Sequence, residues 1–156
     1  MDNRISKHIS YKEATFSQTA TRKDIDNIPS PEVLERMKTL AENIFEPLRA
    51  HVEGPIKINS FYRSILLNTA IGGSKSSQHT RGEAIDLDDS FGHMSNKDMF
   101  EFIKDELDFD QLIWEFGDDN NPAWVHVSYV SPENNRRRIL KASKKNGKTT
   151  YNIMNV

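Results

Sequence analysis

The 156-residue chain contains no cysteine. This absence excludes disulfides, thiolate catalysis and metal sites built from cysteine ligands. The chain also lacks any apolar run long enough to cross a membrane, and its opening residues, Met1 to His8, lack the apolar core of a signal peptide. We therefore expect a protein without a membrane span that is made in the cytoplasm and depends on other factors for any release or export.

The chain carries little net charge of either sign. Its 21 basic and 23 acidic residues give a formal net charge of -2, so the molecule as a whole has no electrostatic reason to bind nucleic acid. Hydrophobic residues make up 36% and charged residues 28%, which is typical of a folded domain. Because no repeat or low-complexity linker interrupts the chain, we expect a single domain over residues 1–156. The sequence does not reveal the oligomeric state, and a monomer is our default expectation.

Helical signals concentrate in the first half of the chain. Ser10 and Glu13 have the spacing of a capping box, which predicts a short helix from Tyr11. Ser30 and Pro31 begin the clearest helix. Its apolar stripe comprises Val33, Leu34, Met37, Leu40, Ala41, Ile44, Phe45 and Leu48. Residues 21–30 are expected to form a loop, and further helices are predicted over about 64–71 and after Ser95.

Strand signals dominate the second half. Alternating or β-branched segments predict strands over about 56–60, 84–88, 111–116 and 124–130. The last part of the chain, turning at Asn146-Gly147, is typical of a β-hairpin. Helices mainly early and strands mainly late favour an α+β fold with a largely antiparallel sheet and helices packed on one side.

Three side chains could form a metal site. His79 and Asp86 lie seven positions apart with Gly82 between them, and His126 follows in an alternating segment. Two imidazoles and a carboxylate suit a zinc ion whose fourth position stays open for water, an arrangement that promotes hydrolysis. If the strands carrying Asp86 and His126 pair, the ligands can converge from a rigid sheet.

The spacing alone leaves other interpretations open. A single histidine often serves as a hydrogen-bonded structural residue, and Asp86, followed by Asp88 and Asp89, could belong to a solvated acidic turn. The residues by themselves therefore do not decide between a metal site and these structural roles.

A wider set of residues resembles a known family. The motif Ser-x-His-x-x-Gly-x-Ala-x-Asp at residues 77–86 is similar to that of the zinc D-Ala-D-Ala carboxypeptidase family of metallopeptidases. Further similarity to its small, phage-associated, endolysin-like branch lies at residues 17–20, 26–29, 48–49, 58–64, 72–74 and 124–128. The resemblance implies a zinc peptidase with His79, Asp86 and His126 as ligands. It also implies action at the cell wall on peptidoglycan stem peptides or cross-links, as a D,D-carboxypeptidase or endopeptidase.

The resemblance extends to two candidate catalytic residues. Arg63 matches an arginine of the family, and its guanidinium could hold a substrate carboxylate or a developing oxyanion. Better-described members carry a glutamate or histidine two or three positions before the last ligand, where this chain has Ala123 and Trp124. We therefore propose Glu115 as the general base, because apolar neighbours can raise a carboxyl pKa into a useful range.

Three polar residues beside the proposed ligands complete the candidate site. Ser77, Gln78 and Ser128 are expected to contact substrate or to hydrogen-bond the ligands, because metal-binding histidines usually need a hydrogen-bond partner.

Two other functional classes remain as alternatives. Because Ala123 and Trp124 cannot move a proton, the chain could be a catalytically inactive, zinc-containing wall-binding or structural module. The basic run at residues 136–148 could indicate a nucleic-acid-binding domain, or attraction to anionic wall polymers or membrane surfaces, although a solvated edge hairpin explains it equally well.

Overall fold

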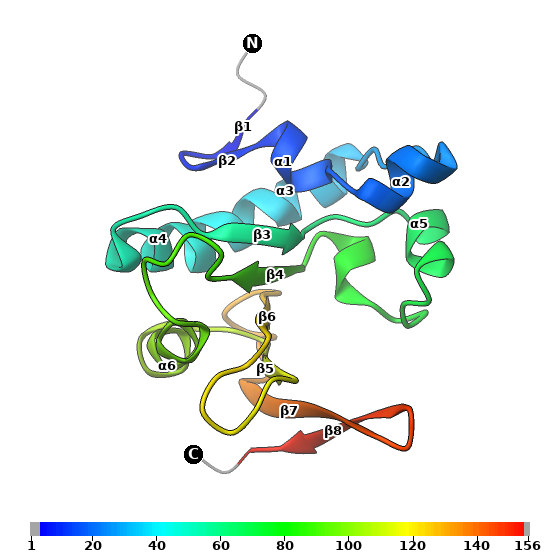
Figure 1. The fold of residues 1–156 in the computed structure, drawn as a ribbon. Helices are drawn as coiled ribbons and strands as arrows, with labels where there is room; N and C mark the ends of the chain where they lie inside the picture. Colours follow the sequence, from blue (N-terminus) through cyan, green and yellow to red (C-terminus); the bar gives the residue numbers. More distant parts are fainter. Residues whose placement is uncertain (1–3, 155–156) are drawn as a thin grey trace.

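A six-stranded mixed sheet is the centre of the fold in the computed structural model, which describes residues 4–154. Its strands are β3 (Lys57–Ser60), β4 (Ala84–Asp88), β5 (Gln111–Glu115), β6 (Trp124–Ser128), β7 (Arg138–Lys145) and β8 (Lys148–Ile153). They lie in the order β3-β4-β6-β5-β7-β8, and all neighbours are antiparallel except β5 and β7 (Figure 1). The α+β fold with a mostly antiparallel sheet is therefore confirmed.

The remaining elements lie mainly in the first half of the chain. They are β1 (Arg4–Ser6), β2 (Ile9–Ser10), α1 (Tyr11–Thr15), α2 (Gln18–Lys23), α3 (Pro31–Leu40), η1 (Ala41–Phe45), α4 (Glu46–Val52), α5 (Ile65–Ala70), η2 (Gln78–Arg81) and α6 (Asn96–Glu106). Strands β1 and β2 form a separate antiparallel ribbon. The predicted cap of α1 is confirmed, because the Ser10 hydroxyl accepts a hydrogen bond of 3.0 Å from the Glu13 backbone N–H.

The predicted long helix forms, with one irregular turn inside it. Ser30 caps its start by accepting a bond from the Val33 N–H, and the helical path continues through η1 and α4 to Val52. In the π-helical η1 the Glu46 N–H bonds to the Ala41 carbonyl, five residues back. Pro47 follows at once, and since proline offers no N–H and crowds the carbonyl four residues before it, a widened turn accommodates the ring.

The loop expected at residues 21–30 is wrong for its first three residues. Helix α2 runs through them to Lys23 and ends at Asp24, whose φ of 54° lies in the left-handed region. The Ser17 hydroxyl caps this helix by accepting a bond from the Ala20 N–H. A six-residue polar segment has no apolar stripe for sequence analysis to detect, because its helicity depends on the cap and on packing.

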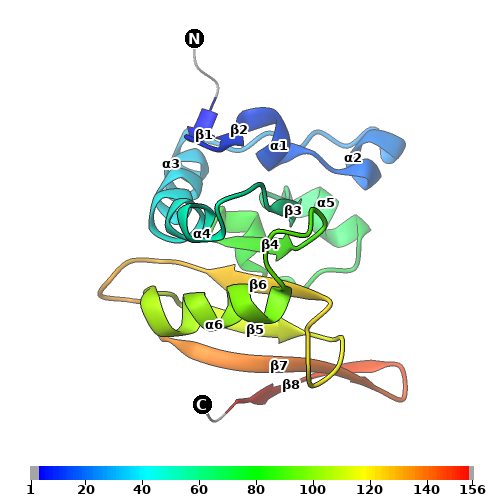
Figure 2. The same ribbon diagram turned by 60° about the vertical axis from the view of Figure 1, so that its left-hand side comes forward.

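The two faces of the sheet have different roles. The main hydrophobic core lies on one face, where buried strand residues such as Leu87, Leu112 and Val127 pack with the long helix and α6. Figure 2 shows α6 lying across β5 and β6 on this face. We call the opposite face the site face. The side chains of this face that line one open groove are Asp86, Gln111, Ile113, Glu115, Trp124, His126, Arg138, Leu140, Lys144, Thr149 and Tyr151.

The predicted C-terminal hairpin is confirmed. Asn146 and Gly147 have φ values of 54° and 77°, the positive values that a two-residue hairpin turn of the primed type needs. Strand β7 pairs in parallel with β5, an arrangement that periodicity does not reveal. The hairpin thereby extends the sheet by two strands beyond β5.

Candidate metal centre

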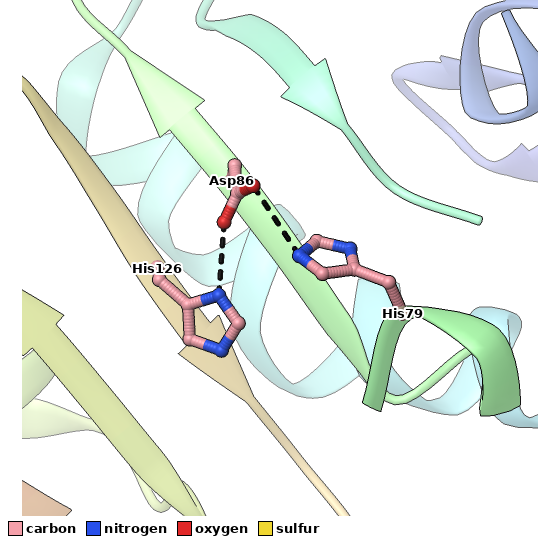
Figure 3. A group of neighbouring side chains, drawn as sticks. All are labelled: His79, Asp86 and His126. Carbon is pink, nitrogen blue, oxygen red and sulfur yellow. Dashed lines mark hydrogen bonds and ion pairs between the residues drawn. The ribbon is translucent and has the colours of Figure 1, made fainter. Parts of the chain in front are cut away.

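His79, Asp86 and His126 come together on the site face. The His126 Nδ1 lies 2.9 Å from one Asp86 carboxylate oxygen, and the His79 Nε2 lies 3.3 Å from the other (Figure 3). One ligand atom from each residue can be chosen so that all three lie within 4.8 Å of one another. Three donors at this separation can share one ion.

Strand pairing produces most of this convergence. Strands β4 and β6 are adjacent and antiparallel, with Asp86 directly opposite His126. Side chains of paired residues point to the same face of a sheet, so the register alone brings the carboxylate and the imidazole together. The condition stated from the sequence, that the strands of Asp86 and His126 pair, is therefore met.

His79 reaches the site from the short helix η2 and is held in one tautomer. Its Nδ1 lies 2.8 Å from the Phe61 carbonyl oxygen, which can only accept, so Nδ1 carries the proton and donates. The Nε2 lone pair then faces Asp86, and this buried nitrogen has no hydrogen-bond donor among residues 4–154. Burial lowers the pKa of His79, although Asp86 opposes the shift, and so favours the neutral imidazole that a metal requires.

Asp86 supplies the charge of the cluster. Burial by itself would raise its pKa, but His79 and His126 outweigh that effect and hold the pKa well below its usual range. The group is thus a carboxylate flanked by two imidazoles. This donor set, together with the His79 Nε2 lone pair that receives no hydrogen bond within residues 4–154, fits a zinc ion with one position left open.

Gly82 makes the turn between His79 and β4 possible. It ends η2 in the left-handed region with φ of 74°, as its place between the two residues predicts. A Cβ at this position would lie 2.8 Å from both the Val33 carbonyl oxygen and the Met37 side chain. The turn therefore packs directly against α3, and only glycine fits there.

Arg63 lies beside the cluster on a firmly held backbone. Its N–H donates to the His79 carbonyl at 3.2 Å, and the next residue, Ser64, donates to the Asn27 side chain at 2.7 Å. The Arg63 Nε is buried without a hydrogen-bond partner among residues 4–154. Burial lowers the pKa of Arg63, while the nearby Asp86 opposes that shift.

Glu115 also faces the groove, at the end of β5. It pairs with Trp124 in the register of β5 and β6, so its side chain lies on the same face as His126. Burial raises the pKa of Glu115 to about 7, with His126 opposing and Asp86 reinforcing the shift. Its carboxylate makes no ion pair or hydrogen bond within residues 4–154, which leaves both oxygens free for a ligand in the groove.

None of the three polar residues expected beside the ligands hydrogen-bonds a ligand side chain within residues 4–154, but Ser77 and Gln78 line the groove. The Ser77 hydroxyl caps η2 by accepting from the His79 N–H, and the Ser128 hydroxyl accepts from the Gln111 N–H. The Gln78 amide donates to Asp110 at 2.9 Å. Within residues 4–154, the His79 ring contacts Asp86 through Nε2 and hydrogen-bonds the Phe61 carbonyl through Nδ1. Because the second partner is a backbone group, a motif of side chains could not predict it.

A buried carboxylate below the groove was not identified from the sequence. Asp110 is 1% exposed and accepts from Gln78 and from the backbone N–H, Nε and Nη2 of Arg136, at 2.8–2.9 Å. Burial would raise its pKa, but the bonds from Arg136 and Gln78 bring the pKa to about 2. This network links the segment that carries His79 to the start of the C-terminal hairpin.

The groove over the site face is large enough for an extended peptide. Its volume is about 1010 Å³, and its walls include η2 and most of the segment 72–77. Both polar and charged side chains line it, including Arg63, Glu115 and the three residues of the cluster. No helix in the part of the chain described by the structure is long and apolar enough to cross a membrane.

Comparison with known proteins agrees with this geometry. The family model for peptidase M15 matches residues 7–128, a segment that contains Arg63, Glu115 and the whole histidine–aspartate cluster. A search of curated proteins found no match. Peptidase M15 enzymes are zinc-dependent peptidases, and the His79, Asp86 and His126 cluster is a possible site for their metal. The chain therefore belongs to the peptidase M15 family, the zinc D-Ala-D-Ala carboxypeptidase-like metallopeptidases.

Proposed function

We propose that this chain hydrolyses peptide bonds in peptidoglycan stem peptides or cross-links, as a D,D-carboxypeptidase or endopeptidase acting at the cell wall. His79, Asp86 and His126 would hold zinc, Glu115 would act as the general base and Arg63 would bind the substrate. The observation that carries this proposal is the convergence of two imidazoles and one carboxylate on the floor of a peptide-sized groove, in a chain of a peptidase family.

Glu115 has the properties that the proton transfers need. Bound zinc would lower the pKa of a water molecule and polarise the scissile carbonyl. Glu115 would accept the proton of that water and donate it to the leaving amine. A pKa of about 7 suits both transfers near neutral pH, because the same group must be able to take up and release a proton.

The position of Glu115 also supports its role in place of the missing motif. Ala123 and Trp124 occupy the places where the better-described relatives carry their base. The Ala123 N–H donates to the Glu115 carbonyl at 2.9 Å, and Trp124 pairs with Glu115 across β5 and β6. The Glu115 carboxylate therefore comes from the strand position directly beside residues 123 and 124, where those relatives carry their base.

Arg63 can position the substrate on the other side of the cluster. Its buried Nε lacks a partner among residues 4–154, so the guanidinium retains donors for a carboxylate or a carbonyl oxygen. The Arg63 backbone is bonded to the His79 carbonyl, so the residue that carries the guanidinium is held next to the proposed ligand. Donors in such a place can stabilise negative charge that develops on a substrate oxygen.

The test is digestion of purified peptidoglycan by the zinc-loaded protein and by protein stripped with a chelator, with fragments identified by mass. We expect zinc-dependent cleavage, and the ends of the new fragments will identify the peptide bond that is hydrolysed. Glu115→Gln should keep one equivalent of zinc and lose at least about 100-fold in turnover. Zinc binding without any cleavage by the unaltered chain would instead support the inactive wall-binding module.

A further inference from the structure

The C-terminal hairpin forms a large part of the groove floor. Strands β7 and β8 lie outside the residues that the family model matches, yet they contribute Arg138, Leu140, Lys144, Thr149 and Tyr151 to the groove. None of these five is acidic, whereas the part of the floor near the metal cluster carries Asp86 and Glu115. The acidic groups of this floor therefore lie near the cluster, where Arg63 is also found, and the hairpin contributes only neutral and basic side chains.

The positive groups of the groove differ in how far they are neutralised. Arg81 pairs with Glu83 at 2.8 Å, and the Nε and Nη2 of Arg136 are taken by Asp110. The Nη1 of Arg136 has no hydrogen bond within residues 4–154. The Arg138 guanidinium makes no ion pair or side-chain hydrogen bond with any residue of the same range, although its backbone N–H is anchored to the Asp110 carbonyl.

We propose that Arg138, assisted by the free Nη1 of Arg136, binds a carboxylate of the peptide substrate away from the bond that is cleaved. This inference rests on the proposed peptidase function. A guanidinium on a rigid strand offers planar paired donors that match a carboxylate, and it does so best where no protein carboxylate competes for it. Arg138 satisfies both conditions. Its backbone pairs with Gln111 of β5 and donates to the Asp110 carbonyl, and its guanidinium has no ion pair or hydrogen bond within residues 4–154.

The sheet register sets how far this carboxylate lies from the cleaved bond. Gln111 pairs with Arg138, and Ile113, one pleat further along β5, pairs with His126. Two strand spacings and one two-residue step separate Arg138 from His126, or roughly 12 Å between Cα atoms. An extended peptide covers that distance in about three residues, and the arginine side chain shortens it. We therefore place the carboxylate two or three residues from the scissile bond.

The test compares two stem peptides that differ in one group, a free carboxylate or its carboxamide, two or three residues from the bond identified by the digestion. If the digestion releases no fragments, the position is counted from the terminal D-Ala-D-Ala bond. We expect the unaltered chain to prefer the carboxylate peptide by about ten-fold in kcat/KM, mainly through KM. Arg138→Gln should abolish the preference, whereas Arg138→Lys should retain part of it. Lys148→Gln is the matched control, since it removes the same charge from the same hairpin outside the groove, and it should retain the preference.

The outcomes separate this inference from the proposed function. An unchanged preference in Arg138→Gln, or an equal loss in Lys148→Gln, would overturn the carboxylate site. Calorimetric binding of both peptides to the same variants gives a second readout that does not depend on turnover. A chain that cleaves neither peptide but binds the carboxylate form more tightly through Arg138 would refute the peptidase and support the site, and equal binding of both peptides would refute the site.

Discussion

His126 lies directly opposite Asp86 on adjacent antiparallel strands, with its Nδ1 2.9 Å from the aspartate Oδ1. Forty residues of chain separate the two positions, but one backbone register fixes both side chains on the same face of the sheet. His79, from a short helix outside the sheet, completes the cluster through its Nε2.

The cluster should lose its metal when either imidazole is removed. We expect His79→Ala and His126→Ala each to reduce bound zinc from one equivalent to nearly none after dialysis, because two ligands do not hold the ion tightly. Metal content measured by atomic emission checks this. His93→Ala is the matched control, since His93 is exposed and outside the groove, and it should retain the zinc. Full occupancy in His126→Ala would remove His126 from the ligand set.

Glu115 should make the metal-free protein less stable as the pH rises. The folded pKa of about 7 lies above the ordinary value of 4.5, so between these values the folded state binds a proton that the unfolded state has released. Stability therefore falls from pH 4.5 to 7, by up to about 3 kcal/mol, and this contribution is constant above that window.

Urea unfolding of the metal-free chain and of Glu115→Gln at pH 5 and pH 8 checks this dependence. The glutamine cannot ionise, so the variant should gain stability relative to the unaltered chain as the pH rises. Parallel changes in both proteins would show that Glu115 is not the group responsible.

The turn at Gly82 should tolerate no side chain. Gly82→Ala would place a methyl group 2.8 Å from the Val33 carbonyl oxygen. Alanine is also strained at a φ of 74°, because its Cβ disfavours the left-handed region. Together we expect these effects to lower the unfolding free energy by about 2–4 kcal/mol. Gly72→Ala is the matched control, because Gly72 has φ of 78° but nothing within 4 Å of an added Cβ. It should lose only about 1 kcal/mol. Equal losses in chemical denaturation would show that α3 does not constrain the turn.

The buried Asp110 should be more important for stability than its exposed neighbour. Asp110→Asn removes the charge that pairs with Arg136 and leaves donors of Arg136 and Gln78 poorly matched, so we expect a loss of about 2–4 kcal/mol. Asp108→Asn is the control, since Asp108 is 44% exposed and pairs with Arg137 at 3.5 Å. It should lose less than about 1 kcal/mol. Thermal melts of both variants measure the difference.

Acid should weaken the same network. The folded pKa of Asp110, about 2, is lower than its ordinary value of 3.8, so its stabilising contribution is complete above pH 4 and is lost as the pH falls toward 2. Asp110→Asn should accordingly lose less stability than the unaltered chain between pH 4 and 2. The same acid sensitivity in both proteins would contradict this assignment.

The sequence by itself determined much of the local structure. Caps at Ser10 and Ser30, the apolar stripe of the long helix and the Asn146-Gly147 turn depend on interactions between residues close in the chain, which act wherever the segment lies. The motif around His79 and Asp86 likewise identified the family, because the spacing of these residues is a property of the chain.

Tertiary structure alone decided how these pieces form one site. Three features depend on residues that are far apart in sequence. They are the pairing of β7 with β5, the Phe61 carbonyl that orients His79, and the hydrogen-bond network around Asp110. The helix α2 was missed for a related reason, since its few residues form a helix only with a cap and packing. Periodicity reports which side of a strand faces the core, but not its neighbours, because strand pairing is settled by the burial and hydrogen bonding of the whole sheet.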